Sequence, residues 1–228
     1  MTIDIQEYQT AAEGWSAEET VRWGFSRFHP GIAIASSFGA EDVVLIDLAA
    51  RIRPDFRVFT LDTDFLFPET YTLIDQIERQ YGLQIERARS RYTPEEQAAA
   101  FGEALWSREP DKCCNLRKVE PLTQKLAGLS AWITGIRRDQ SPTRAHARKL
   151  EWDSKFNLVK LNPLADWTWE QVWDYIRGRN IPYNPLHDRN YPSIGCTHCT
   201  RQVQPGEDMR AGRWSGFQKT ECGLHRKE

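Results

Sequence analysis

Five cysteines are the residues of this chain whose type and spacing most clearly suit a chemical role. Cys113 and Cys114 are adjacent, Cys196 and Cys199 form a C-x-x-C pair, and Cys222 stands alone near the end. Paired thiolates bind zinc or the irons of an iron–sulfur cluster. Adjacent cysteines suit a tetrahedral zinc site poorly, but they can reach two different irons of one cluster. The pattern predicts a four-cysteine metal site, against the alternative of buried, inert thiols, and a separate fifth thiol.

Cys222 has the sequence surroundings of a nucleophile. The nearby cations are Lys219, His225, Arg226 and Lys227. Positive charge lowers the pKa of a thiol and favours the reactive thiolate. The alternative is a tail residue without a role. His198, which lies inside the C-x-x-C pair, is expected to be an exposed loop residue rather than a metal ligand.

A fold must position these groups, and the composition indicates a single globular domain. The 228 residues are 40% hydrophobic and 27% charged, which is ordinary for such a domain and sufficient for a core. No stretch is apolar for long enough to span a bilayer, and residues 1–7 do not resemble a secretory signal. We therefore expect a cytoplasmic protein, in which structural disulfides are rare. The basic segment 137–149 is expected to favour an anionic ligand.

Apolar periodicity and turn signals alternate between strands and helices along the chain. Strands are expected at 31–35, 56–61, 83–85, 130–135 and 157–161, and helices at 16–28, 43–52, 68–81, from 93, 113–126 and 168–178. This alternation predicts an α/β fold with a mostly parallel sheet and helices on both faces. The α/β core is expected to cover about residues 16–181 of the single domain. Residues 182–228 are expected to form an irregular, cysteine-bearing tail.

Turns of small or polar residues follow three predicted strands, at 36–39, 62–63 and 135–138. Ligands of such sheets bind beyond the carboxyl ends of the strands, so we expect these turns to meet at one edge. The first turn has neither the Walker A nor the dinucleotide-binding pattern, and an ordinary strand-to-helix turn is the alternative.

Three cations outside the turns are candidates for a role at the site. Lys118 lies one turn beyond Cys114 on a predicted helix, so we expect it close to the metal site. Arg210 and Arg213 are three residues apart and could share a face, and arginine side chains suit bidentate binding of phosphate or sulfate. A solvated surface position is the usual alternative for an isolated charge.

Together these residues resemble the assimilatory adenylyl-sulfate reductases of the APS/PAPS reductase family, bacterial enzymes that reduce adenosine 5′-phosphosulfate (APS) with thioredoxin. The motifs that carry the resemblance run from residue 31 to the tail. They are Ser-Ser-Phe-Gly-Ala-Glu-Asp (36–42), Leu-Asp-Thr (61–63), Cys-Cys-x-x-Arg-Lys (113–118), Gly-Ile-Arg-Arg-Asp-Gln-Ser (135–141), Ile-Pro-Tyr-Asn-Pro-Leu-His-Asp (181–188), Gly-Cys-x-x-Cys-Thr-Arg (195–201), Gly-Arg-Trp (212–214) and Glu-Cys-Gly-Leu-His (221–225).

The resemblance implies a Rossmann-like adenine-nucleotide α-hydrolase fold of the PP-loop type. The S-G-G-x-D-S loop of ATP pyrophosphatases is replaced here, which argues against ATP cleavage. The resemblance also implies one [4Fe–4S] cluster on Cys113, Cys114, Cys196 and Cys199, and Cys222 as the catalytic nucleophile. The substrate-binding residues that it implies are Ser36, Ser37, Phe38, Gly39, Leu61, Asp62, Thr63, Lys118, Gly135, Arg137, Arg144, Arg210, Arg213 and His225.

The implied reaction is the reduction of APS to sulfite and AMP in assimilatory sulfate reduction and cysteine biosynthesis. The Cys222 thiolate would attack the sulfur and form an S-sulfocysteine, from which thioredoxin or a glutaredoxin-like dithiol releases sulfite. The cluster is expected to act through structure and charge rather than as the electron donor. A homo-oligomer without nucleic-acid or membrane partners is expected.

Two alternatives stay open. The first is a reductase of 3′-phosphoadenosine 5′-phosphosulfate (PAPS), or of both nucleotides, although PAPS reductases typically lack the two cysteine pairs. The second is a cysteine-ligated metalloprotein that binds nucleic acid or senses redox state. The net charge of −2 weighs against nucleic-acid binding.

Overall fold

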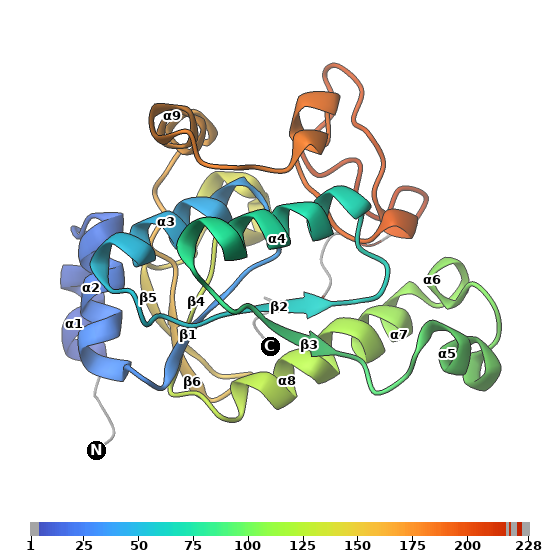
Figure 1. The fold of residues 1–228 in the computed structure, drawn as a ribbon, viewed down its shortest axis with the longest axis horizontal. Helices are drawn as coiled ribbons and strands as arrows, with labels where there is room; N and C mark the ends of the chain where they lie inside the picture. The colour runs from blue at the N-terminus through green and yellow to red at the C-terminus, as the bar shows by residue number, and fades with distance from the viewer. Residues whose placement is uncertain (1–4, 218, 220–222, 225–228) are drawn as a thin grey trace.

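A six-stranded sheet forms the centre of the computed structural model, which describes residues 5–217, 219 and 223–224 (Figure 1). The strand order is β3-β2-β1-β4-β6-β5, and all neighbours are parallel except β5, which runs antiparallel to β6 at one edge. The strands are β1 (Ile32–Ala35), β2 (Val58–Asp62), β3 (Glu86–Arg89), β4 (Ala131–Ile133), β5 (Leu150–Asp153) and β6 (Leu158–Leu161). The predicted α/β fold with a mostly parallel sheet is confirmed.

Helices connect the strands and extend beyond the sheet. In chain order the α-helices are α1 (Gln6–Ala12), α2 (Ala17–Phe28), α3 (Ala40–Ile52), α4 (Pro68–Tyr81), α5 (Pro94–Phe101), α6 (Leu105–Arg108), α7 (Pro110–Cys114), α8 (Glu120–Leu126) and α9 (Trp169–Arg179). A π-helical turn, η1 (Asn115–Val119), joins α7 to α8. The 3₁₀ turns are η2 (Arg138–Gln140), η3 (Pro142–Arg144), η4 (Pro185–Arg189) and η5 (Thr197–Cys199). None of the helices in the described part of the chain is long and apolar enough to cross a membrane.

The sheet is covered on both faces, which gives three layers. Alternate strand residues such as Ile32 and Ile34 pack with α2, α3, α4 and α9 in the larger core. Ala33, between them, points to the opposite face and joins Phe59 and Trp132 in a smaller core under α8. Burial on both faces explains why the central strands read as short apolar runs rather than as alternating patterns.

Local signals fix the helix ends that matter here. The hydroxyls of Ser16, Thr93 and Thr168 accept hydrogen bonds from the third residue of α2, α5 and α9, and each forms a reciprocal capping box. Pro68 opens α4, and Gly82 ends it with a left-handed φ of 64°, which glycine adopts without strain. These boundaries agree with the sequence prediction.

Four elements differ from the prediction. The third strand lies at 86–89 instead of 83–85, because the pairing of Glu86–Arg89 with β2 outweighs the local apolar pattern of the preceding residues. Helix α1 and the edge strand β5 were not expected. The predicted helix at 113–126 begins earlier, at Pro110, and its second turn is π-helical.

Candidate active site

A cleft lies at the carboxyl ends of β1, β2 and β4, where the sequence predicted a binding edge. It contains about 1400 Å³ of space, part of which is open to solvent. The segment that follows α9 supplies further lining residues, which include Ser193–Gly195, Met209, Arg210, Arg213 and Trp214. Of the predicted substrate-binding residues, those that line the cleft are Ser36, Ser37, Gly39, Leu61, Thr63, Lys118, Gly135, Arg137, Arg144, Arg210 and Arg213.

Two of the predicted substrate-binding residues that the structure describes, Phe38 and Asp62, do not line the cleft. Phe38 is buried in the larger core. Asp62 is also buried, and its carboxylate accepts hydrogen bonds from the Tyr71 hydroxyl (2.7 Å) and from Arg89 Nη2 (2.7 Å). Both therefore support the wall from behind. Cys222 and His225 lie outside the described residues.

The turn after β1 is held by Asp42. Its carboxylate accepts hydrogen bonds from the backbone N–H (2.5 Å) and the hydroxyl (2.8 Å) of Ser37. Burial raises the pKa of Asp42 to about 6, and the hydrogen bonds from Ser37 only partly oppose this shift. A Cβ on Gly135 would lie 2.4 Å from Asp42 Oδ1, so the turn after β4 must contain glycine to approach the first turn this closely. The two turns therefore form one packed wall.

Most cations of the basic segment 137–149 form ion pairs with acidic side chains of the same chain. Arg137 is fully buried, and it donates to Glu41 Oε1 (2.9 Å) and pairs with Asp139. Arg138 pairs with Glu13, and Lys149 pairs with Asp166. The expectation that this segment forms an anion-binding patch is therefore wrong for Arg138 and Lys149, because acidic residues distant in sequence neutralise them.

Arg144 is the member of that segment that reaches the cleft without being fully buried. Its Nη1 donates to Gln140 Oε1 (2.6 Å). Gln140 in turn donates to Glu41 Oε1 (2.9 Å), the carboxylate oxygen that also accepts from Arg137. Arg137 thus supports the wall through the same network that orients Arg144.

Arg210 and Arg213 lie over one aromatic surface, which confirms that they share a face. Their guanidinium carbons are 5.9 and 4.5 Å from the centre of the buried Trp214 ring. Arg213 Nη1 donates to the Ser193 hydroxyl (3.1 Å). Its Nε is buried and has no hydrogen-bond partner among the described residues. Stacked, preorganised guanidinium groups of this kind suit phosphate or sulfate.

A second cavity adjoins the cleft and contains the two cysteine pairs. Its lining residues are Phe65, Trp106, Pro110, Cys113, Cys114, Arg117, Lys118, Cys196, His198 and Cys199. The four thiols are free of disulfides. Burial, followed by the proximity of the other three thiols, raises the pKa of Cys113 to about 12. Among the described residues, no group of three or more His, Cys, Asp or Glu side chains is arranged to hold a metal ion.

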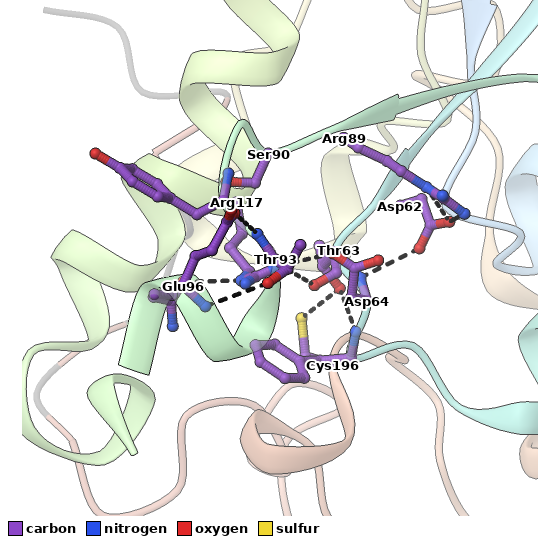
Figure 2. Close-up of polar contacts among 12 residues, drawn as sticks. Asp62, Thr63, Asp64, Arg89, Ser90, Thr93, Glu96, Arg117 and Cys196 are labelled. Atoms are coloured by element: carbon purple, nitrogen blue, oxygen red, sulfur yellow. Dashed lines mark hydrogen bonds and ion pairs between the residues drawn. The ribbon is translucent and has the colours of Figure 1, made fainter. Parts of the chain in front are cut away.

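The end of β2 links the two cavities (Figure 2). The Thr63 hydroxyl lies 3.3 Å from Cys196 Sγ, with either atom able to donate. Arg117 is buried, and its Nη1 donates to the Thr63 carbonyl (3.0 Å) and to Asp64 Oδ2 (2.7 Å). One short turn therefore contacts both the C-x-x-C loop and the helix that carries the adjacent cysteines.

Lys118 lines both cavities. Burial raises the pKa of Cys199, and the positive charge of Lys118 acts against this rise. Lys118 is therefore close enough to influence the thiols electrostatically while it also borders the cleft.

His198 is exposed, as predicted, but it is not isolated. Its ring stacks on Trp106 with centroids 3.9 Å apart and planes 9° apart, and the edge of Phe65 completes this aromatic cover over the cysteine cavity.

Several residues of the cleft wall were missed in the sequence analysis. They are Glu41, Gln140, Trp169, His187 and Trp214. Both ring nitrogens of His187 are buried without a hydrogen-bond partner among the described residues, and the ring packs edge-on against Trp169 and Trp173. Glu41, Gln140 and Trp214 lie in the same motifs as predicted residues, and His187 lies in the motif at 181–188, so these motifs were the available signal, whereas Trp169 lies in none of them.

Comparison with known proteins places these features in a family context. The phosphoadenosine phosphosulfate reductase domain matches residues 31–202. The adenosine 5′-phosphosulfate reductase of Halalkalibacterium halodurans is 48% identical over 98% of this chain and 97% of its own length. That of Staphylococcus haemolyticus is 50% identical over 98% of this chain and 91% of its own.

Solved structures agree on the fold. The phosphoadenylyl-sulfate reductase of Candida auris, in a phosphate complex, superposes with a TM-score of 0.78 and 29% identity, over 88% of this chain and 98% of that one. The FMN adenylyltransferase of Candida glabrata, bound to FMN and an ATP analogue, gives a TM-score of 0.58 at 18% identity, over 90% of this chain and 74% of that one. This second likeness shows a shared fold alone.

The Asp42→Asn substitution should make the stability of the folded protein less dependent on pH. The folded pKa of Asp42, about 6, lies above its ordinary value of 3.8, so folding favours the protonated acid. Wild-type stability should therefore fall as the pH rises from 4 to 7, by roughly 2 kcal/mol from this group. Asparagine cannot ionise, so the variant should gain stability relative to wild type over this range, as measured by denaturant unfolding at both pH values.

Asp55→Asn is the control for this experiment. Hydrogen bonds from Arg53 lower the pKa of the exposed Asp55, so its removal should give no such gain. Parallel pH dependences of wild type and Asp42→Asn would refute the assigned role of burial.

Gly195→Ala should weaken anion binding. The added methyl group would lie 2.5 Å from Arg213 Nη2 and would displace the guanidinium group. Loss of one charged hydrogen-bonding partner should raise the Kd for inorganic phosphate about tenfold, as measured by calorimetry. Gly128→Ala, where a methyl group meets open space, is the matched control. Equal affinities of the two variants would show that Arg213 does not bind the anion.

Proposed function

Because the chain belongs to the phosphoadenosine phosphosulfate reductase domain family, we propose that it reduces APS to sulfite and AMP with electrons from thioredoxin or a glutaredoxin-like dithiol. Relatives that are about half identical over nearly the whole chain carry the name adenosine 5′-phosphosulfate reductase, which supports this substrate. The cytoplasmic location and the homo-oligomeric state suggested by the sequence belong to the same proposal.

The observation that carries the proposal is the position of Lys118 between the cleft and the cysteine cavity. An ammonium group at this position can contact an anion in the cleft and also neutralise thiolates beside it. Neither cavity alone would require such a cation. The cleft and the four cysteines are therefore interpreted as parts of one site.

The cleft has the chemistry that a nucleotide with a phosphosulfate group needs. The backbone of the Ser36–Gly39 turn, with Leu61 and Gly135, would bind the adenosine portion. Lys118, Arg144, Arg210 and Arg213 line the same cleft and would neutralise the phosphosulfate. This neutralisation allows an anionic thiolate to approach and stabilises the departing phosphate oxygen.

The proposed reaction needs one thiolate as the nucleophile and one external dithiol as the reductant. Cys222 attacks the sulfur, the bond between sulfur and the bridging oxygen breaks, and AMP leaves with that electron pair. A thioredoxin thiolate then attacks the Cys222 sulfur, and sulfite leaves with the electrons of the S–S bond. The second thioredoxin thiol resolves the mixed disulfide and restores Cys222. The dithiol supplies both electrons.

Cys113, Cys114, Cys196 and Cys199 would hold a [4Fe–4S] cluster. The donor set fits such a group, because four soft thiols without disulfides line one cavity and influence one another electrostatically. When bound, the group would join the two cysteine segments and add a fixed charge near Lys118, and all electrons for the reduction still come from the dithiol.

A PAPS reductase is the second candidate, because the matching family model and the similar Candida auris structure carry that name. The two nucleotides differ in the 3′-phosphate. The ratio of kcat/KM for APS and PAPS decides between them, and we expect it to favour APS.

The chemical scheme predicts a covalent intermediate on the tail. Anaerobically purified protein mixed with APS alone should release one AMP per chain and carry a sulfonate on Cys222, as measured by peptide mass spectrometry. Thioredoxin should then release sulfite. A sulfonate that is absent from Cys222, or that persists in Cys222→Ser, would refute the scheme.

Lys118→Met should lower kcat/KM for APS by about a hundredfold or more, since it removes a charge that stabilises the transition state. Lys125→Met removes a lysine that pairs with Glu86 outside the cleft and is the matched control, with an expected change of less than about twofold. Similar kinetics for both variants would show that Lys118 has no role in the reaction.

A further inference from the structure

We propose that Gln140 is a positioning residue that stands between the Arg144 guanidinium group and the Glu41 carboxylate and prevents these two groups from neutralising each other. The inference rests on the proposed function, in which Arg144 neutralises the phosphosulfate group of the substrate. Gln140 lies in the motif at 135–141 and lines the cleft, and its side chain is a neutral amide between two charged groups.

The amide of Gln140 forms hydrogen bonds at both of its ends. Its Oε1 accepts from Arg144 Nη1 (2.6 Å) and from the backbone N–H of Arg137 (3.1 Å). Its Nε2 donates to Glu41 Oε1 (2.9 Å) and to the Gly135 carbonyl (3.2 Å). The partners of the oxygen can only donate and those of the nitrogen can only accept, so the chemistry determines which way the amide points. A glutamine amide is a neutral group that satisfies all four partners.

The carboxylate of Glu41 is the reason that Arg144 needs a neutral neighbour. Glu41 Oε1 accepts a hydrogen bond from the buried Arg137 (2.9 Å), and removal of a partner from a buried cation is strongly destabilising. The wall therefore contains an acidic group one amide away from Arg144. The Glu41 side chain is 13% exposed, so solvent screens its charge weakly, and direct pairing with Arg144 would neutralise both groups. The amide keeps Glu41 with Arg137 and away from Arg144.

The place of Gln140 is set by two short turns. Its backbone N–H donates to the Arg137 carbonyl (3.4 Å) in η2, and its side chain returns to the Arg137 N–H. Arg144 ends η3, where its N–H donates to the Ser141 carbonyl (2.9 Å). Turns of one segment therefore hold the amide and the guanidinium group together before a ligand binds. Such preorganisation lowers the cost of ordering a cation around an anion.

The test uses the full-length protein, purified anaerobically. The variants are Gln140→Ala and Gln140→Glu, each alone and combined with Glu41→Gln, together with Glu41→Gln itself. Gln76→Ala, at an exposed position of α4, is the control. The measurements are the Kd for inorganic sulfate by calorimetry, kcat and KM for APS, and the thermal unfolding midpoint. Inorganic sulfate reports on the cations of the cleft whatever the nucleotide is.

The two substitutions of Gln140 should respond in opposite ways to Glu41→Gln. Gln140→Ala should raise the Kd for sulfate about tenfold, because Glu41 can then pair with Arg144. Adding Glu41→Gln should return this Kd to within about threefold of wild type. Gln140→Glu should also raise the Kd about tenfold, because the new carboxylate pairs with Arg144 directly, and Glu41→Gln should not restore binding. The kcat/KM values for APS should follow the same order, and Gln76→Ala should match wild type.

A purely structural role for Gln140 predicts the reverse pattern. Glu41→Gln supplies an amide donor opposite Gln140→Glu, so a role in satisfying hydrogen bonds alone would rescue that pair and leave the Gln140→Ala pair impaired. Any pattern other than rescue of the Gln140→Ala pair alone would overturn the proposal, as would a Gln140→Ala variant that binds sulfate like Gln76→Ala.

Two further outcomes are kept distinct. If Gln140→Ala does not fold, the Gln140→Glu pair, which preserves the size of the side chain, decides by whether Glu41→Gln restores sulfate binding. A wild-type protein that does not bind sulfate would overturn the proposal. Failure of the proposed function is seen instead as a wild-type protein that binds sulfate but forms no sulfite from APS, and the sulfate Kd values would still report on Gln140.

Discussion

The buried guanidinium group of Arg117 is the interaction on which the site depends. It is 1% exposed, and it donates to the Thr63 carbonyl, to Asp64 Oδ2 and to Gln97 Oε1. A charge removed from water is tolerated only when such partners satisfy it, and loss of one partner leaves an uncompensated charge. The contact therefore fixes the helix that carries Cys113 and Cys114 against the end of β2.

Because of the π-helical turn, the burial of Arg117 also determines where Lys118 lies. Arg117 and Lys118 are neighbours in η1, yet Arg117 is buried under the β2 turn while Lys118 borders both cavities. Neighbouring helical side chains point in different directions, and the wider π turn changes their spacing relative to an α-helix. Such turns occur frequently at functional sites. Anchoring one residue of the pair thus places the other between the cleft and the cysteines.

The sequence was sufficient for the features that local chemistry controls. The capping box at Ser16, the glycine stop at Gly82 and the turns after β1, β2 and β4 all have local signals. The parallel sheet follows from the alternation of elements. The cysteine pairs are visible by spacing alone, and the structure brings both to one cavity.

Features that depend on distant partners could not be predicted in the same way. The sequence predicted that Arg138 and Lys149 would bind an anion. In the fold, Arg138 forms an ion pair with Glu13 and Lys149 forms one with Asp166. Strand β3 consists of Glu86–Arg89, a charged segment without an apolar pattern, and its place is set by pairing with β2. Trp214 gives no sign in sequence that it supports two arginines, because that role requires the tail to return to the sheet.

The position of Leu224 couples ligand binding in the cleft to the placement of the tail. Its side chain lines the same cleft as Leu61 and belongs to the same apolar cluster. A ligand in the cleft and the docked tail therefore share a surface, and their free energies are coupled. Linkage makes this coupling reciprocal: whatever factor the contact of Leu224 adds to the affinity of the cleft for a ligand, the ligand adds to the stability of that contact. Release of the ligand would then change how firmly Leu224 is held against the cleft.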